Sequence, residues 1–457
     1  MEFSTYGTPL TELPANIGSL SSLKNLSVGQ GRFLSSLPDS VGRLSSLVML
    51  KIEQTSITDL PQDIGALKTL EKLELRNSNI TELPESIGLL ENLTMLMLNR
   101  CKQIRTLPAS IGQLKSLHQL QMKETAVTEL PDSFGMLSSL MVLSMGKKPQ
   151  AGGPAEENFI LPASFSNLSL LRNSFCRLPA SLSGMSMLQE LLLPHCRKLK
   201  SLPPLPSCLK KVDIANCIAL ESICDVSNLE NLTELNLTNC EKVEDIPGLE
   251  CLNSLVRLYM SGCKACSSAV KRRLAKKVSS LALYVVESYL RKIRNLSMPG
   301  SKIPDWFSQE MVTFSKRGNR PLKSVIICVV VSLNHQIPDD LREELPAVVD
   351  IQAQILILDS PTFTRTLILS GVPNTNDDQF HLCRYPIDHP LVSQLKDGYK
   401  IHVKRREPPY VKGVELKKWG LYLIYEGDDD YEGDEESLNE SQQSLSEQLA
   451  NFFSTFE

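Results

Sequence analysis

The sequence predicts an α/β solenoid of parallel strands, followed by an all-β sandwich. Three observations support this order. A segment of 23 or 24 residues recurs along the first part of the chain, the composition changes after Asn295, and an acidic stretch begins at Glu426. The chain has 457 residues, of which 42% are hydrophobic and 22% are charged. These values indicate a globular chain of two or three domains.

The recurring segment contains Leu-Pro followed by Ile-Gly or a near equivalent. The stretch 60–65 (Leu-Pro-Gln-Asp-Ile-Gly) returns as 83–88 (Leu-Pro-Glu-Ser-Ile-Gly), and Leu-x-x-Leu-x-Leu follows each, as in 70–75. A fixed period of this length with this core is the signature of leucine-rich repeats. We expect the Pro to lie on the outer side, where no ladder hydrogen bond is needed. We expect the Gly to permit the tight outer turn.

The last two leucines of each repeat alternate at period two, so they face one side of a short strand. The residues between them face the other side, and we call this face the concave surface. It mixes charged, amide and apolar groups, a composition that suits protein recognition; the alternative is a merely solvated strand face. The predicted protein-binding residues are Lys51, Glu53, Lys72, Glu74, Arg76, Met95, Met97, Asn99, Gln119, Gln121, Lys123, Glu190, Lys211, Asp213, Glu234, Asn236, Arg257 and Tyr259.

Five of the twelve cysteines follow the last strand leucine of a repeat by three residues: Cys101, Cys196, Cys217, Cys240 and Cys263. This is the Asn/Cys position of the repeat. We expect reduced, buried thiols there, each bonded weakly to loop backbone.

The repeat pattern opens at Leu10 with no preceding cap, although a solenoid needs a polar end cap. We therefore expect either a longer parent chain or a frayed first coil. An insertion at 146–159 and a shortened step at 161–178 interrupt the pattern. In a solenoid such insertions lie near the binding face.

Residues 267–294 carry apolar residues at helical spacing, and we expect a helix that caps the last coil. Its Lys271-Arg272-Arg273 cluster fits either a nuclear localisation or phosphate-binding patch, or a solvated helix face. Beyond it, strand-like runs occur at 323–333, 349–358, 363–369, 400–404 and 420–425. They predict the sandwich.

The C-terminal tail holds 11 acidic and no basic residues from Glu426 on. We expect disorder there, with a short helix allowed by Leu445, Leu449 and Phe453. The predicted parts are a solenoid (1–266), a helical cap or linker (267–294), a sandwich (295–426) and the acidic tail (427–457). Candidate partner-contacting loops of the sandwich are 334–345, 373–379 and 405–411.

Chemistry-bearing motifs are missing from the sequence. It has no phosphate-binding Gly-rich loop, no His-Glu-x-x-His and no nucleophile elbow, and Cys263-Lys-Ala-Cys266 is a lone Cys-x-x-Cys. We therefore predict no enzyme, no cofactor and no metal. The chain lacks a dense basic face, so nucleic acid is not the expected partner. Without a leader or a membrane-length apolar run, we expect a cytoplasmic or nuclear location.

Two parts of the sequence resemble plant intracellular immune receptors of the TIR–NB-ARC–LRR class. They are the repeat sequence and the stretch Pro299-Gly300-Ser301-Lys302-Ile303-Pro304-Asp305-Trp306-Phe307. In that family the Pro-Gly-Ser box opens a C-terminal jelly-roll/Ig-like domain (C-JID), and the ending 420–426 is similar to its last strand. We call Pro299, Gly300, Ser301, Ile303, Pro304, Trp306 and Phe307 the Pro-Gly-Ser box.

The resemblance implies a protein-recognition arm that binds a pathogen effector or a host target and keeps the receptor autoinhibited. In the full-length receptor, binding would trigger defence and hypersensitive cell death through the nucleotide-binding (NB-ARC) and TIR domains, which this chain does not contain. The alternative is a stand-alone repeat scaffold or decoy that binds a host protein or a sibling receptor. The effector and the role of the acidic tail stay open.

Overall fold

The computed structural model describes residues 1–127, 130–146, 166–171, 177–178, 180–275, 293–316, 320–338, 341–342, 345, 347–426, 428 and 445–454. The chain divides into two compact units, Met1–Leu209 and Lys210–Glu457. The boundary falls inside the repeats. The insertion expected at 146–159, apart from Gly146 at the end of β7, and most of the shortened step at 161–178 lie outside the described residues.

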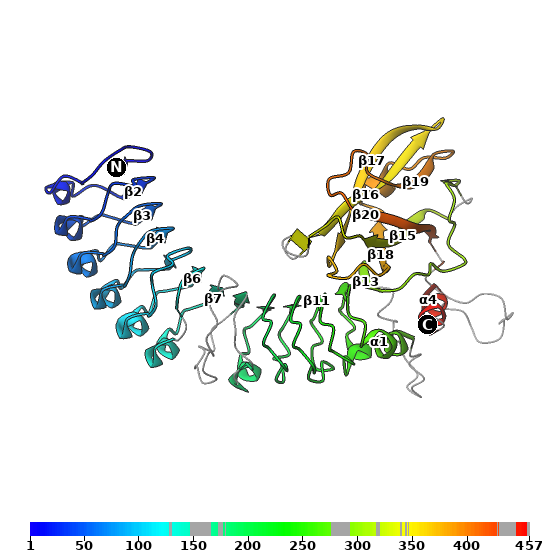
Figure 1. Ribbon diagram of the computed structural model, residues 1–457, viewed down its shortest axis with the longest axis horizontal. Helices are drawn as coiled ribbons and strands as arrows, with labels where there is room; N and C mark the ends of the chain where they lie inside the picture. Colours follow the sequence, from blue (N-terminus) through cyan, green and yellow to red (C-terminus); the bar gives the residue numbers. More distant parts are fainter. Residues whose placement is uncertain are drawn as a thin grey trace. The chain divides into compact units, whose positions relative to one another are not determined.

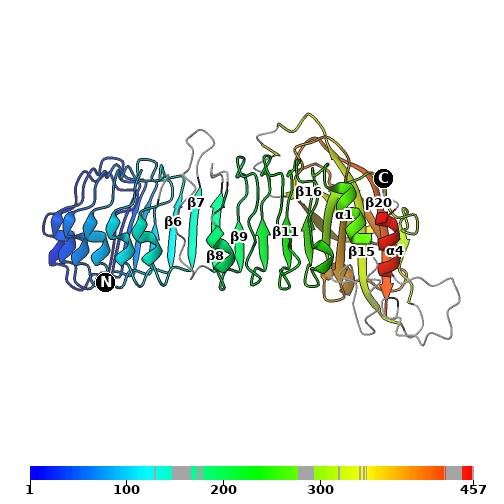
Figure 2. The same ribbon diagram turned by 90° about the horizontal axis from the view of Figure 1, so that it is seen from below.

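The first unit is a parallel β-solenoid in which strands line the inner side of an arc and short 3₁₀ helices line the outer side (Figures 1 and 2). Each strand pairs in parallel and in register with the next, from β1 to β9. The elements are β1 (Glu2–Ser4), η1 (Ile17–Ser19), β2 (Asn25–Gly29), η2 (Asp39–Arg43), β3 (Met49–Glu53), η3 (Gln62–Ala66), β4 (Lys72–Arg76), η4 (Glu85–Leu89), β5 (Met95–Met97), η5 (Ala109–Gln113), β6 (Gln119–Lys123), η6 (Asp132–Met136), β7 (Val142–Gly146), β8 (Asn167–Leu171), η7 (Ala180–Gly184) and β9 (Glu190–Leu192).

Strand β1 was not expected from the sequence, which shows its first repeat only from Leu10. Glu2 pairs with Asn25 and Ser4 with Ser27, so three residues extend the sheet before the first complete coil. A strand this short has too few residues to display an alternating pattern, which is why the sequence did not reveal it.

The leucine pattern predicts the interior of the solenoid correctly. In β4 the burial alternates residue by residue, with Leu73 and Leu75 fully buried and Glu74 and Arg76 partly exposed. The 3₁₀ helices η2 to η6 each follow a Pro in extended conformation, as at Pro61 and Pro84. The strands and outer turns of successive coils therefore stack on one continuous apolar core.

The glycine of each outer turn has a different role from the one we expected. Gly65 does not have a positive φ, so the turn itself does not require glycine. A Cβ at Gly65 would instead lie 2.4 Å from the carbonyl oxygen of Ser86 in the next coil, and Gly42, Gly88 and Gly112 have equally close neighbours. These glycines allow the coils to approach each other.

We expect Gly65→Ala to lower the free energy of unfolding by about 2 kcal/mol, because a backbone carbonyl cannot move aside without displacing a coil. Urea-induced unfolding followed by circular dichroism measures the change. Gly184→Ala is the control, since a Cβ there would have no neighbour within 4 Å. Equal stability of both variants would contradict this packing role.

The second unit begins with parallel repeat strands and then changes to antiparallel pairing. Strands β10 (Lys211–Asp213), β11 (Glu234–Asn236) and β12 (Arg257–Tyr259) are parallel, and β13 (Asn295–Pro299) is parallel to β12 but antiparallel to β18. The remaining elements are η8 (Leu249–Cys251), α1 (Ser267–Ala275), β14 (Val312–Thr313), β15 (Leu322–Leu333), β16 (Ala347–Ile357), β17 (Ser360–Ser370), β18 (Gln379–Pro386), α3 (Pro390–Ser393), β19 (Lys400–Arg405), β20 (Val414–Tyr425) and α4 (Leu445–Ser454).

Two antiparallel sheets enclose one apolar core in this unit. The first has the order β13-β18-β15-β20 and the second β14-β19-β16-β17. The core between them draws Val329 from β15, Ile351 and Ile355 from β16, Leu367 from β17 and Ile401 from β19. All five runs that the sequence marked as strands are strands, whereas β13, β14 and β18 were missed.

Two helices lie side by side at the end of the solenoid, α1 and α4 (Figures 1 and 2). The expected helix at Leu445, Leu449 and Phe453 is confirmed, and these three side chains are buried. Phe453 and its neighbour Phe452 contact Phe380 of β18, with ring centroids 6.3 and 5.7 Å apart. This end of the acidic tail is therefore part of the fold rather than disordered.

Candidate binding surface

The concave surface of the first unit consists of rows that run across its strands. The strand register aligns Lys51 with Glu74, Glu74 with Met97, and Met97 with Gln121. The predicted residues of this unit all lie on this face or at its edge, namely Lys51, Glu53, Lys72, Glu74, Arg76, Met95, Met97, Asn99, Gln119, Gln121, Lys123 and Glu190.

Several of these side chains bind one another. Lys51 pairs with Glu53 at 2.9 Å, and the hydrogen bond to that carboxylate raises the pKa of the Lys51 ammonium. Asn99 donates from Nδ2 to Gln121 Oε1 at 2.8 Å. Because these groups are already oriented, a partner would meet an ordered polar surface and lose less side-chain entropy on binding.

Met97 is less accessible than we expected. Arg76 donates from Nη2 to the Met97 sulfur at 2.7 Å, and only 7% of Met97 is exposed. The Arg76 Nε also lies 3.6 Å from Glu74 Oε2. Met97 thus supports the Arg76 guanidinium. The accessible side chains of this face are Lys72, Arg76 and Lys123.

The second unit carries the remaining predicted residues, Lys211, Asp213, Glu234, Asn236, Arg257 and Tyr259. Glu234 accepts from both neighbours in its row, Lys211 at 2.8 Å and Arg257 at 3.2 Å. Burial raises the pKa of the Asp213 carboxyl, even though it accepts a hydrogen bond from the Ala215 N–H.

Tyr259 does not offer a contact surface. It is 8% exposed, and burial raises the pKa of its hydroxyl to about 12. Ser370, at the end of β17, hydrogen-bonds it. The second sheet of the sandwich thus reaches β12, a long-range contact that the repeat pattern could not reveal.

The expected partner-contacting loop 373–379 makes contacts with the repeats. We call residues 371–379 the docked loop. Asn239 donates from Nδ2 to Val372 O at 3.0 Å and accepts from the Asn374 N–H at 2.9 Å. Lys264 pairs with Asp377 at 2.5 Å, and this ammonium lowers the pKa of that carboxyl.

The other two expected loops are also held by internal contacts. Arg342 is 4% exposed, and it donates to Asn334 O at 2.8 Å and to Asn376 Oδ1 at 2.7 Å. Arg342 and Asn376 both line a polar groove of about 540 Å³. The backbone N–H groups of Tyr410 and Val411 donate to the buried Asp350 carboxylate. Arg342 and the backbone of Tyr410 and Val411 are therefore held by internal contacts, while residues 339–340 and 343–344 of the first loop lie outside the described residues.

The Pro-Gly-Ser box packs on the outer side of the first sandwich sheet. Trp306 and Phe307 lie against Tyr422 of β20, with ring centroids 4.9 and 5.7 Å apart. A Cβ at Gly420 would lie 2.8 Å from Ile303 and 2.9 Å from Phe307. Pro299 ends β13, the Gly300 N–H donates to Asp378 O, Ser301 O accepts from Lys418, and Pro304 O accepts from the Phe307 N–H.

The repeat cysteines have the predicted role. Cys196, Cys240 and Cys263 donate to the carbonyl oxygens of Leu170, Ile214 and Leu237, the last Leu or Ile of the repeat pattern one coil earlier, at 3.0, 3.1 and 2.8 Å. All are buried and free of disulfides, and burial raises the pKa of the Cys240 and Cys263 thiols. Cys263 is therefore a repeat residue. Within the described ranges, no three His, Cys, Asp or Glu side chains form a potential metal site.

The basic cluster of α1 is not simply solvated. Arg273 binds Asp245 and Glu250 of the last coil, donating to the latter at 2.7 and 2.8 Å. Lys271 is 8% exposed, and burial lowers its pKa to about 8. Arg273 thus fixes α1 on the repeats and Lys271 is buried, whereas Arg272 is exposed.

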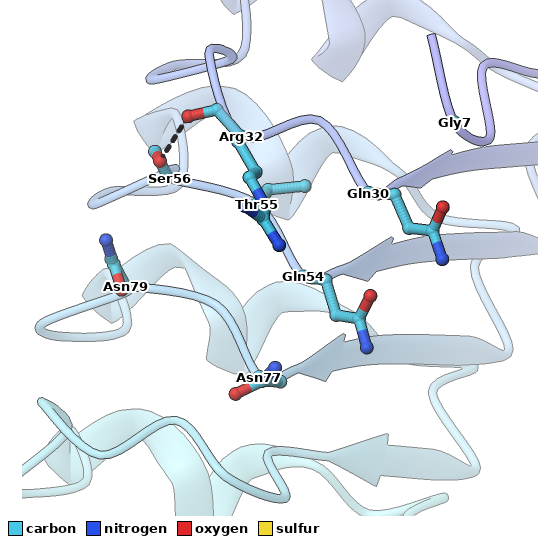
Figure 3. A pocket seen from close by; sticks show the side chains of 8 residues that line it. All are labelled: Gly7, Gln30, Arg32, Gln54, Thr55, Ser56, Asn77 and Asn79. Atoms are coloured by element: carbon cyan, nitrogen blue, oxygen red, sulfur yellow. Dashed lines mark hydrogen bonds between the residues drawn. The ribbon is translucent and has the colours of Figure 1, made fainter. Parts of the chain in front are cut away.

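A polar recess of about 590 Å³ in the first unit had no counterpart among the sequence predictions. Figure 3 shows Gln30, Gln54 and Asn77 one below the other, each just beyond the end of a strand. Arg32, Thr55, Ser56 and Asn79 complete the lining with Gly7. The sequence signal was weak, because the three stacked positions do not share one residue type.

The comparison with family models gives the class of the chain. The leucine-rich repeat region family matches residues 49–105 and 100–300, more than half of the chain. The chain belongs to this family. None of the helices in the described ranges has the length and apolarity needed to cross a bilayer.

Among curated proteins, the chain is similar to the disease resistance-like protein DSC2 of Arabidopsis thaliana, with 39% identity over 57 residues. The match spans 12% of this chain and 5% of that relative's length.

Among solved structures, an internalin of Listeria monocytogenes has 18% identity, a TM-score of 0.46, and coverage of 59% of this chain and 77% of the other. A leucine-rich-repeat protein of Leptospira interrogans has 24% identity, a TM-score of 0.37, and coverage of 58% and 80%. The plant peptide hormone receptor RGFR1, solved with RGF2, has 23% identity, a TM-score of 0.41, and coverage of 58% and 49%.

Proposed function

We propose that the chain is the recognition arm of a plant intracellular immune receptor of the TIR–NB-ARC–LRR class. The concave surface binds a pathogen effector or a host target protein, and the arm keeps the parent receptor autoinhibited until then. Support comes from the repeats, the Pro-Gly-Ser box and the local likeness to a disease resistance-like protein. The chain acts in the cytoplasm or nucleus, has no catalytic role, and acts through the NB-ARC and TIR domains of the receptor.

The domain organisation that accompanies this proposal is a solenoid (1–266), a helical cap (267–294), a jelly-roll/Ig-like C-terminal domain (295–426) and a tail (427–457). Two antiparallel sheets around a shared core support the sandwich assignment. The aromatic contacts of Trp306 and Phe307 support a packing role for the box.

The observation that carries the proposal is the ordered concave surface of the first unit. Its polar groups are oriented by ion pairs and hydrogen bonds among themselves, whereas the long basic side chains of Lys72 and Lys123 are exposed. A surface of this kind steers a partner of complementary, acidic charge.

The test is to screen the full chain by pull-down against purified pathogen effector proteins. For an effector that binds, the variant Lys72→Glu/Arg76→Glu/Lys123→Glu should lose at least tenfold in affinity, because three charges on one face are reversed. The control Arg43→Glu/Lys68→Glu reverses charges outside the concave surface, at η2 and just after η3. Unchanged affinity of the concave variant would overturn the proposal.

A further inference from the structure

In most of the repeats that the structure describes, a residue shortly after the strand has the left-handed backbone conformation. The φ angles are 54° at Gln30, 54° at Gln54, 50° at Asn77, 66° at Arg100 and 58° at Glu124, and 61° at both Asn216 and Asn239 in the second unit. We call these residues the left-handed row. Among residues other than Gly, Asn tolerates this conformation best.

The backbone of the row is fixed by the neighbouring coil. The N–H groups of Gln30, Gln54 and Asn77 donate to Glu53 O, Arg76 O and Asn99 O at 2.9 to 3.0 Å. Since adjacent strands lie about 4.8 Å apart, the side chains of successive members form a regularly spaced line.

One member of the row shows what a carboxamide at this position can bind. Asn239, 2% exposed, donates to Val372 O at 3.0 Å and accepts from the Asn374 N–H at 2.9 Å. These two backbone groups flank Pro373. In an extended segment they point to the same side, so one carboxamide, with its donor and its acceptor, binds the backbone of the docked loop at two points.

The corresponding carboxamides of the first unit have no such occupant. Gln30, Gln54 and Asn77 are exposed, and no side-chain hydrogen bond joins them to any residue in the described ranges. They line the polar recess together with Asn79 and Arg32, and Figure 3 shows the Gln30 and Gln54 side chains extending in the same direction. Arg32 is the only charged residue among those lining it.

We propose that Gln30, Gln54 and Asn77 bind the backbone of an extended peptide segment that carries an acidic side chain opposite Arg32. The inference rests on the proposed function, because the segment would belong to the partner protein. Carboxamides bind peptide N–H and C=O groups whatever the side chains of the segment, and Arg32 supplies the preference for charge.

The experiment selects ligands for the full chain from a display library of linear twelve-residue peptides. Enriched peptides are synthesised, and their affinities are measured by fluorescence anisotropy. Gln30→Gly/Gln54→Gly/Asn77→Gly keeps the left-handed backbone but removes the three carboxamides. We expect enriched acidic peptides to bind this variant at least tenfold more weakly, and N-methylation of their backbone to weaken binding as much.

The matched control is Arg100→Gly/Glu124→Gly, which changes two members of the same row that lack a carboxamide and pair with each other at 3.4 Å. It should leave peptide affinity unchanged. The inference is overturned if no peptide is enriched, or if enriched peptides bind the triple variant as tightly as the parent chain. Either result leaves the test with Lys72, Arg76 and Lys123 untouched, so the two proposals fail separately.

Discussion

The second unit should lose stability as the pH falls below about 6.5, because His381 of β18 is buried as a neutral imidazole. It is 2% exposed, and its Nε2 has no hydrogen-bond partner among the residues that the structure describes. Its register neighbours, Ser297 and Val329, are neutral. Burial lowers the pKa of His381 from 6.5 to about 3.

The sign follows from proton binding in the two states. Between pH 6.5 and about 3 the unfolded chain binds a proton at this histidine that the folded chain does not bind, so acid favours unfolding. The free energy of unfolding falls by about 1.4 kcal/mol for each pH unit in this window. The total loss over this window is on the order of 5 kcal/mol.

Urea-induced unfolding between pH 7 and pH 4 measures this dependence. His381→Leu removes the titrating group and should be more stable than the parent chain by about 3 kcal/mol at pH 4, while its stability at pH 7 differs little. His335→Gln is the control, because His335 is exposed in the same unit. Parallel pH curves for the parent chain and His381→Leu would rule out this cause.

Removal of the Asn239 side chain should cost the second unit about 3 kcal/mol. Asn239→Gly keeps the left-handed backbone, so the loss reports the carboxamide alone. Its hydrogen bonds to Asn216, Val372 and Asn374 are buried or nearly so. Each contributes about 1 kcal/mol and leaves an unsatisfied partner when it is lost.

Chemical denaturation gives the magnitude, and amide hydrogen exchange locates it. The Asn374 N–H should exchange faster in Asn239→Gly, because its acceptor is gone. Asn216→Gly is the comparison: it changes the preceding member of the left-handed row but leaves both backbone contacts of Asn239 in place, and we expect about a third of the effect. If exchange at Asn374 stays unchanged, the carboxamide does not hold the docked loop.

The local features of the repeats could be predicted from the sequence because each coil repeats the same short-range rule. Buried leucines, outward strand positions and the cysteine row all depend on residues within one or two coils. The outer-turn glycine was located correctly but explained wrongly. Its constraint comes from the carbonyl of the next coil rather than from its own φ.

Features that depend on distant segments could not be predicted. Tyr259 follows the repeat pattern but is buried because β17 ends beside it, 111 residues later in the chain. Strand β18 was missed because it mixes His381, Cys383 and Arg384 with apolar residues, and His381 and Cys383 are buried by pairing on both sides. The left-handed row shares a backbone angle, which Gln, Asn, Arg and Glu side chains do not indicate in a single sequence.

Strand β13 has a mechanical consequence for the second unit. It pairs with β12 of the solenoid on one side and with β18 of the sandwich on the other. A hinge between the last coils and the sandwich would have to break one of these rows of hydrogen bonds, and the docked loop fixes the same joint from a second side. If a bound protein displaced the sandwich, the coils that contain β10 to β12 would therefore have to move together with it.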